Sequence, residues 1–217
     1  MHQDPTCPRC GHEVRAPGLW SSAWECSRHG VVDPYFVLAH NGADAVAHVV
    51  QRAQVPVWVP RGLPHGWVCS GVGYAGDERT GARATVTCLS GPGPLGGAAD
   101  LMIVAEEPGV GLGARHAGLG GPDPGTGFGV GAPHAKVLAA AHPTALWSVQ
   151  VASDRAVFVG EAKGLWLWTI VWPAGAGVVM YDVLSLSDLR DEALDVDLAF
   201  GAVSPRMSNP LDEPDGA

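Results

Sequence analysis

Two short motifs near the amino end constrain this chain more than any other feature of its sequence. Cys7 and Cys10 are separated by two residues, Cys26 and His29 have the same separation, and 15 residues lie between the two pairs. Thiolate and imidazole are ligands that zinc prefers, and a C-x2-C turn presents two thiolates from one tight loop. A glycine follows the second ligand of each pair, where it can turn its N–H toward sulfur. The four side chains are therefore predicted to bind zinc.

The segment that carries these ligands resembles a zinc ribbon, with CPxCG and CxxHG knuckles, over about residues 5–32. Residues 12–16 and 23–25 are interpreted as the arms of a hairpin around Pro17 and Gly18. A complete Cys3His shell leaves no open position for water, so the zinc is expected to support folding rather than hydrolysis. The alternative, thiols that are free or paired as a disulfide, is disfavoured by the doubled spacing and by a cytosolic location.

The charge of the chain makes nucleic acid an unlikely partner. There are 13 basic and 22 acidic side chains, which give a formal net charge of -9, and the ribbon contains three of each kind. This distribution offers no electrostatic footprint for phosphates. Trp20 and Trp24 offer apolar area in the ribbon instead. The ribbon is therefore expected to contact a protein or to dock onto the rest of its own chain.

The amino-terminal residues predict a cytoplasmic location. Residues 1–6 lack the basic and apolar regions of a secretory signal. The uncharged stretch at residues 164–181 has just about the minimum length for a membrane span, but Pro173 and the small residues after it would break a helix at its centre. A buried β-hairpin is expected there, with membrane association as the disfavoured alternative, and no membrane partner is predicted.

Glycine and proline set the fold class of the rest of the chain. The 30 Gly and 18 Pro among 217 residues are too many for a helical bundle. The predicted class is α+β, mainly antiparallel β, with the small zinc ribbon, a short connecting helix and a long Gly/Pro-rich loop. Apolar runs bounded by turn residues predict strands at 55–59, 66–74, 82–90, 99–106, 135–141, 145–152, 156–160 and 165–172.

The expected divisions are a ribbon at 1–32, a linker at 33–54, a β-rich domain at 55–203 and a disordered acidic tail at 204–217. Apolar residues at helical spacing predict a helix within 41–53, with Asn41 or Asp44 as its cap. His40 and His48 beside it are expected to be surface or partly buried imidazoles. Farther on, Ser187 is expected to cap a helical turn through residues 188–194, on a solvated acidic face.

Two features of the predicted β-rich domain each carry two competing interpretations. In the strand at 165–172 both faces are apolar, which favours a central strand over the wall of a small-molecule pocket. Cys69 and Cys88 lie symmetrically about the turn at residues 77–81, so hairpin pairing would place them nearly opposite each other. They are interpreted as small hydrophobic residues rather than as a redox pair.

The segment at residues 108–133 holds ten Gly and four Pro and follows an apolar strand, where a phosphate-binding loop would lie. Its glycines do not complete G-x-G-x-x-G, because Ala114 or His116 occupies the sixth position, and Glu106 and Glu107 would repel an anion. A mobile surface loop that folds over a neighbouring face is expected, and phosphate binding is the open alternative.

A cytoplasmic binding or regulatory module that recognises a protein or a small ligand is the favoured function. The sequence shows no nucleophile elbow, no HExxH motif and no second metal cluster. The alternative is an enzyme of acyl or phosphoryl transfer, with the Gly-rich loop as a lid over a site that contains Glu106, Glu107, His116 or Glu161. As a turn residue, Glu161 is more readily explained as solvated.

The whole chain resembles an uncharacterised actinobacterial, Streptomyces-type family of similar length. The likeness rests on the four ribbon ligands and on the segments at 60–64, 89–92, 106–115 and 165–168. It implies a cytoplasmic protein with no established activity. Similar sequences are sometimes labelled phosphotransacetylase, but the two lysines, the net charge of -9 and the lack of a convincing phosphate loop argue against that activity.

Overall fold

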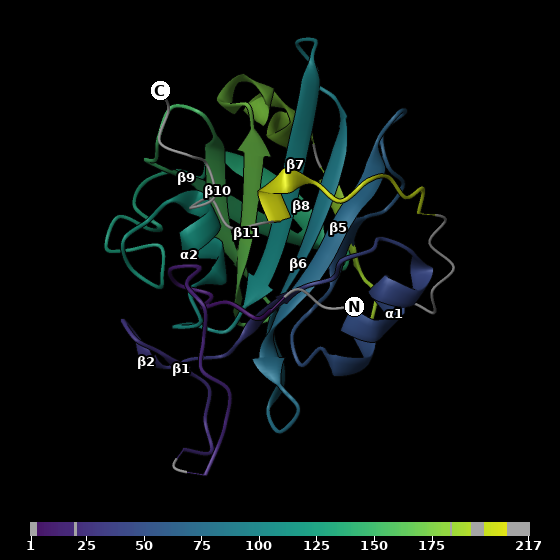
Figure 1. Cartoon of the computed structure of the whole chain (residues 1–217). Helices are drawn as coiled ribbons and strands as arrows, with labels where there is room; N and C mark the ends of the chain where they lie inside the picture. Colours follow the sequence, from purple (N-terminus) through teal and green to yellow (C-terminus); the bar gives the residue numbers. More distant parts are fainter. Residues whose placement is uncertain (1–3, 20, 183, 192–197, 208–217) are drawn as a thin grey trace, which may run out of the picture.

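The computed structural model describes residues 4–19, 21–182, 184–191 and 198–207, and it consists mainly of one twisted sheet of ten strands (Figure 1). Two further strands, β1 (Glu25–Cys26) and β2 (Gly30–Val31), form a separate small sheet. The order across the large sheet is β3 (Tyr35–Val37), β5 (Val68–Asp77), β6 (Gly81–Pro92), β7 (Ala98–Glu106), β11 (Leu165–Trp172), β10 (Ala156–Ala162), β9 (His142–Val149), β8 (Ala135–Ala139), β12 (Leu184–Asp188) and β4 (Trp58–Pro60).

Neighbouring strands of the large sheet run antiparallel, except that β12 runs parallel to β8. The helical elements are few, namely α1 (Ala43–Arg52), α2 (Leu112–Ala117) and the 3-10 helices η1 (Ala174–Tyr181) and η2 (Pro205–Met207). This confirms the α+β class dominated by antiparallel strands. The strands β2, β3 and β12 were not predicted, and β4 begins three residues later than the strand predicted at 55–59.

Both faces of the large sheet are buried, which is clearest at its central strand β11. Leu167 and Val171 belong to one apolar cluster, together with Trp58 of β4. Trp168 belongs to the other cluster, together with Leu112 of α2. The first face is covered by α1, β4 and η1, and the second by α2 and η2. The prediction of a central strand covered on both sides is therefore confirmed.

The predicted connecting helix is present as α1, but neither expected residue caps it. The N-cap is Gly42, without a side-chain hydrogen bond. The Asn41 amide instead donates a hydrogen bond to the Cys69 carbonyl on β5, and Asp44 pairs with His40 Nε2 at 2.8 Å. Asn41 is therefore engaged by a distant strand and Asp44 by a neighbouring histidine, so neither side chain caps the helix.

The hairpin expected at residues 164–181 forms only in its first half. β11 is followed by the 3-10 helix η1 rather than by a second strand. Pro173 has no N–H to continue a ladder, and Gly177 lies so close to the Ala156 side chain that a Cβ there would be 2.6 Å away. The 3-10 helix η1, which begins with the small residues Ala174 to Gly177, packs closely against β10 at this point. Among the described residues, no helix has the length and apolar character needed to cross a membrane.

The two thiols of the β5–β6 hairpin lie on opposite faces of the sheet, contrary to the predicted opposition. A register shift between Cys69 and Gly71 pairs Cys69 with Leu89 and Cys88 with Gly71. A shift of one residue exchanges the face on which a side chain lies, so the two thiols fall in different apolar clusters. Both are buried and free, as expected of small hydrophobic residues.

The acidic stretch near the carboxyl end is partly buried. Ser187 lies in β12 rather than at a helix start. Although burial opposes its charge, hydrogen bonds from Arg190 and Lys163 lower the pKa of Asp188 to about 2. The solvated face expected here is therefore wrong at Asp188. The rest of the predicted helical turn at 192–194, and residues 208–217 of the predicted tail, lie outside the described residues.

Candidate metal centre and adjoining groove

The four predicted zinc ligands come together in the folded chain. Their donor atoms all lie within 4.8 Å of one another, with Cys7 Sγ 3.6 Å from His29 Nδ1 and Cys10 Sγ 3.6 Å from Cys26 Sγ. Zinc–sulfur bonds of about 2.3 Å in a tetrahedron would place two sulfurs about 3.8 Å apart. The spacing of the donors therefore fits one tetrahedral metal ion.

Local backbone geometry builds the two knuckles. Gly11 and Gly30 have φ values of 73° and 68°, as expected for the residue after each second ligand. The Arg28 N–H lies 3.4 Å from Cys26 Sγ. Burial raises the pKa of the Cys7 thiol, whereas, against the effect of burial, hydrogen bonds from backbone N–H groups and His29 lower the pKa of Cys26. The buried Cys7 thiolate would be stabilised by a nearby positive charge. A metal ion at the centre of the cluster would supply that charge.

The ribbon has little apolar core of its own. Its buried cluster consists of Cys7, Cys26 and Val32, with Cys10 and Val14 packed beside them. The predicted hairpin is present, because Arg15 and Glu25 exchange backbone hydrogen bonds. Three of the five clustered side chains are predicted metal ligands, so the donors and the core of the ribbon are largely the same residues.

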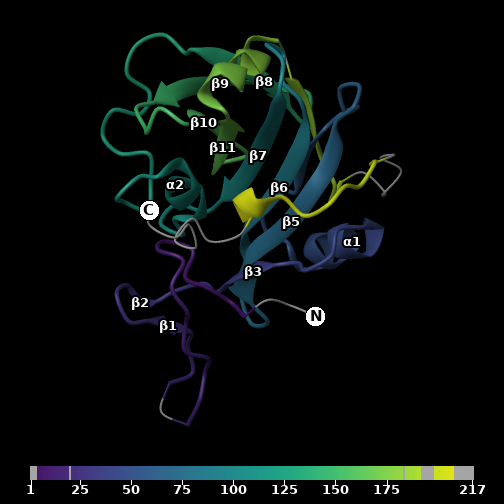
Figure 2. The ribbon, with the colours of Figure 1, turned by 45° about the horizontal axis from the view of Figure 1, so that its top comes forward.

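The ribbon docks onto β3 through a backbone bridge between Thr6 and Tyr35, and onto the α2 segment through two arginines. Arg9, inside the first knuckle, donates to the carbonyls of Gly109 at 2.5 Å and Val110 at 3.3 Å. In return, Arg115 of α2 donates to the Cys7 carbonyl at 3.4 Å. Both views place the ribbon beside α2 and β3 (Figure 2). The expected intramolecular docking of the ribbon therefore exists.

The first part of the Gly-rich segment is not a mobile surface loop, contrary to expectation. It forms α2, whose six residues are all buried. Glu106 accepts hydrogen bonds from the N–H groups of Leu112 at 2.7 Å and Gly113 at 3.1 Å. Burial outweighs these bonds and raises the pKa of Glu106 to about 8. The chain's own carboxyl group thus occupies the N–H groups that a phosphate would need.

The second part of the Gly-rich segment folds over a neighbouring face, as expected. The Phe128 ring lies edge-on between Trp147 and Trp166, at centroid distances of 5.4 and 4.9 Å. Asp123 accepts hydrogen bonds from the Gly109 N–H and the Trp166 indole, each at 2.9 Å. The loop is therefore anchored to β9 and β11.

The structure does not bring the four candidate catalytic residues into one cavity. Glu106 and His116 are buried, with 0% and 2% exposure, and burial, assisted by two nearby arginines, holds the pKa of His116 well below 6.5. Glu107 pairs with Arg83 at 2.7 Å. Glu161 is exposed on β10, as expected of a solvated residue. None of the four lines either pocket described below.

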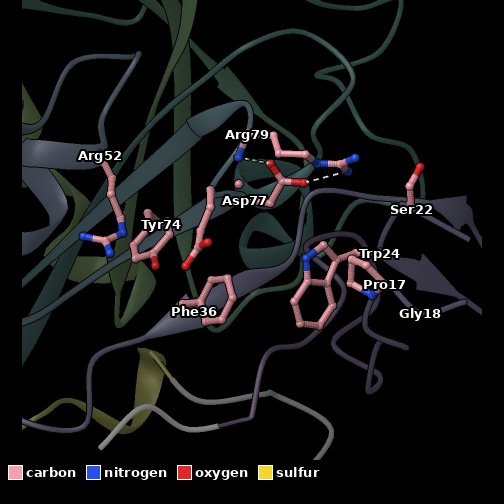
Figure 3. Close-up of a pocket in the computed structure, with 11 residues that line it drawn as sticks. Pro17, Gly18, Ser22, Trp24, Phe36, Arg52, Tyr74, Asp77 and Arg79 are labelled. Carbon is pink, nitrogen blue, oxygen red and sulfur yellow. Dashed lines mark hydrogen bonds and ion pairs between the residues drawn. The ribbon is translucent and has the colours of Figure 1, made fainter.

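A pocket with a volume of about 750 Å³ lies between the ribbon and the large sheet (Figure 3). We call it the aromatic groove. Its walls come from the ribbon hairpin, β3, the end of α1 and the β5–β6 turn. The lining residues are Pro17, Gly18, Ser22, Trp24, Phe36, Arg52, Tyr74, Gly76, Asp77, Glu78 and Arg79.

Three aromatic rings from three separate segments form the apolar part of the groove. The Trp24 ring of the ribbon lies edge-on to the Phe36 ring of β3, with 6.1 Å between the ring centroids. The Phe36 ring stacks on the Tyr74 ring of β5, with 5.2 Å between the centroids. Figure 3 shows the three rings side by side along the pocket. Sequence analysis singled out only Trp24. No local motif marks Phe36 or Tyr74, because they become neighbours only when β3 pairs with β5, and Trp24 joins them only when the ribbon docks.

The charged residues of the groove differ in how they are engaged. Asp77 accepts hydrogen bonds from the backbone N–H groups of Arg79 and Thr80, each at 2.8 Å, and from the Arg79 guanidinium at 3.2 Å. Arg52 lies 3.2 Å from His48 Nδ1. Glu78 is exposed and has no hydrogen bond or ion pair within the described part of the chain.

A smaller pocket of about 400 Å³ lies on the other side of Trp24. Trp24, Asp77 and Arg79 line both pockets. The smaller pocket is also lined by Arg83, which pairs with Asp33 at 3.0 Å and with Glu107. The two pockets therefore adjoin each other along Trp24, Asp77 and Arg79.

Comparison with protein families agrees with the resemblance to an uncharacterised family. The sequence profile of a family described as "Family of unknown function (DUF6758)" matches residues 1–207. Comparison with curated proteins gives no match, and comparison with solved structures gives none. The actinobacterial origin and the phosphotransacetylase label stay untested. Because the match extends over almost the whole length, the chain belongs to the family of unknown function DUF6758.

Proposed function

We propose that this chain is a cytoplasmic, non-enzymatic binding protein that uses the aromatic groove to recognise another protein. The observation that carries the proposal is the joint construction of the groove, with Trp24 from the ribbon and Phe36 and Tyr74 from the large sheet. Aromatic side chains are enriched at protein interfaces, where they supply large contact area at low entropic cost.

In this proposal the Cys3His cluster binds zinc, and the zinc has a structural role. Three thiolates and one imidazole form a donor set that suits zinc, and four protein ligands complete a tetrahedral shell. The ion would hold the two knuckles together, and the ribbon at residues 1–32 would then present Trp24 to the groove. Residues 33–54 would connect it to a β-rich domain at 55–203.

The catalytic alternative has weaker support. Both carboxyl oxygens of Glu106 accept hydrogen bonds from N–H groups of α2, and Glu107 is paired with Arg83. A small-molecule ligand is the better second candidate, because pockets of about 300–1,000 Å³ are typical of such ligands and the groove lies within that range. A melting-temperature screen against a metabolite panel would detect one.

Site-specific photocrosslinking tests the protein-binding proposal. A photoreactive residue at Ser22, which lines the groove, should crosslink to a defined partner in cells. The same residue at Leu95, which is 74% exposed at the β6–β7 turn and lines neither pocket, serves as the control. Crosslinking from Ser22 alone that is lost in Trp24→Ala would support the proposal. Equal crosslinking from both positions, or none from Ser22, would contradict it.

A further inference from the structure

We infer that the occupant of the aromatic groove is a basic, proline-rich segment of the partner in the polyproline II conformation. This inference rests on the proposed function, since it names the partner of the same groove. The observations that carry it are the row of three rings, an unused donor on Trp24 and the unpaired charge of Glu78.

The ring geometry suits an extended, rigid ligand. Proline-rich segments dock in grooves lined by aromatic rings because pyrrolidine rings pack on aromatic faces and the peptide is already ordered. The centroids of Trp24 and Phe36 are 6.1 Å apart, and those of Phe36 and Tyr74 are 5.2 Å apart. At about 3.1 Å per residue, about four residues of a polyproline II helix span the row. Tyr74 is 7% exposed and stacks on Phe36, so the accessible ring surface belongs mainly to Trp24 and Phe36.

The indole of Trp24 provides a directional contact. Its Nε1–H makes no hydrogen bond within the described residues, whereas the indoles of Trp67, Trp147 and Trp166 donate to protein oxygens. A polyproline II peptide has no internal hydrogen bonds, so its carbonyls are free to accept from such a donor. The groove therefore offers both stacking surface and one donor.

Charge complementarity favours a basic segment. Arg79 is tied to Asp77, and Arg52 contacts His48. Glu78 is exposed and forms no ion pair among the described residues, so a cationic side chain of the ligand can neutralise it without breaking an existing contact. Arg52 also forms no ion pair among them, but it already contacts His48. The net charge of -9 on the chain also attracts a cationic partner over a longer range.

Fluorescence anisotropy with synthetic peptides tests the inference on the full, zinc-loaded chain. The probes are a labelled peptide of about ten residues that alternates proline with arginine, a second in which glutamate replaces arginine, and a third in which glycine replaces proline. The first should bind at least about tenfold more tightly than either of the others. Comparable affinity for all three would overturn the inference.

Variants assign the binding to the groove. Trp24→Ala should weaken the basic peptide about tenfold or more, and Trp24→Phe should lose less because a ring remains. Glu78→Lys should weaken it as well, whereas Glu161→Lys, at an exposed acid on β10, should leave it unchanged. Equal losses in both lysine variants would overturn the role of Glu78, because they would indicate net charge alone.

The peptide and crosslinking experiments fail in different ways. If Ser22 crosslinks a partner in a Trp24-dependent manner while the basic proline-rich peptide does not bind, the inference is wrong and the proposed function stands. If neither experiment gives a signal that depends on Trp24, both are wrong. Zinc content and the melting temperature of each variant show whether a loss reflects the groove or misfolding.

Discussion

The ribbon and the α2 segment both contain glycine-bearing turns, yet different forces hold them. The buried cluster of the ribbon is small and is built largely from its own metal donors, Cys7 and Cys26 among them. In α2 all six residues are buried against the large sheet, and Glu106 bonds to its first N–H groups. The ribbon is thus expected to depend on a bound metal ion, whereas α2 depends on apolar packing and one buried carboxyl group.

Metal removal should produce the largest difference in stability between the ribbon and the large sheet with α2. Structural zinc sites contribute about 10–16 kcal/mol of apparent binding free energy, which is folding free energy in a small ribbon. A strong chelator under reducing conditions should therefore expose the amides of residues 5–19 and 21–32 to hydrogen exchange while β7 and β11 stay protected. Loss of protection in both regions together would show that the ribbon is not an independent metal-held unit.

Gly113→Ala should lower the free energy of unfolding by disturbing the packing of α2 against the large sheet. An alanine Cβ would lie 2.3 Å from Trp168 Cδ1, inside a buried indole ring. Alanine gains about 1 kcal/mol in helix propensity, but overpacking costs about 3 kcal/mol at so tight a site, so the clash wins. Chemical denaturation measures the change. Gly120→Ala is the control, because no atom lies within 4 Å of its added Cβ, and a similar loss there would refute this explanation.

Glu106 should make the stability of the sheet depend on pH. Its pKa is raised by burial from 4.5 to about 8 in the folded state. The folded chain therefore binds more protons than the unfolded chain between these values, and stability falls as pH rises through this window. From pH 6.5 to 8 the expected loss is about 1.5–2 kcal/mol.

Replacing Glu106 with Gln should flatten this pH dependence, because the titrating group is gone. Denaturation curves at several pH values, with zinc present throughout, provide the measurement. Glu107→Gln is the matched control, since the neighbouring carboxylate pairs with Arg83 near the surface, and the slope should persist in it. An unchanged slope in Glu106→Gln would mean that another group sets the pH dependence.

Arg9→Ala should have the smallest effect, confined to the contact between the two regions. The Arg9 guanidinium joins the first knuckle to the carbonyls of Gly109 and Val110, and loss of hydrogen bonds from a charged donor costs about 1–2 kcal/mol here. Proteolysis near residues 30–34 should accelerate without loss of bound metal. Arg15→Ala, which removes an exposed pair with Glu25, should not accelerate it.

The same comparison explains what could be predicted from the sequence. The ribbon ligands could be predicted because each pair lies within one turn. The strand β11 could be predicted because it is a continuous apolar run whose side chains point alternately to two buried faces. The conformation of α2 is determined by contacts with Glu106 and Trp168. Glu106 precedes α2 by a few residues without any motif, and Trp168 lies far along the chain.

The aromatic groove was invisible in the sequence for a related reason. Trp24, Phe36 and Tyr74 lie in three different segments. Pairing of β3 with β5 brings Phe36 to Tyr74, and docking of the ribbon brings Trp24 to Phe36. The bulge at Gly71 and the 3-10 helix after Pro173 are likewise selected by tertiary packing. Local spacing therefore identified the candidate metal ligands, whereas the candidate binding surface required the assembled fold.

Native mass spectrometry of the reduced, purified chain tests most directly the claim that a metal ion organises the ribbon. The account predicts a mass increase of one zinc ion per chain, which is lost in Cys10→Ser and kept in the Cys69→Ser control, whose thiol lies outside the cluster. A metal-free chain whose ribbon amides are nevertheless protected from hydrogen exchange would contradict it.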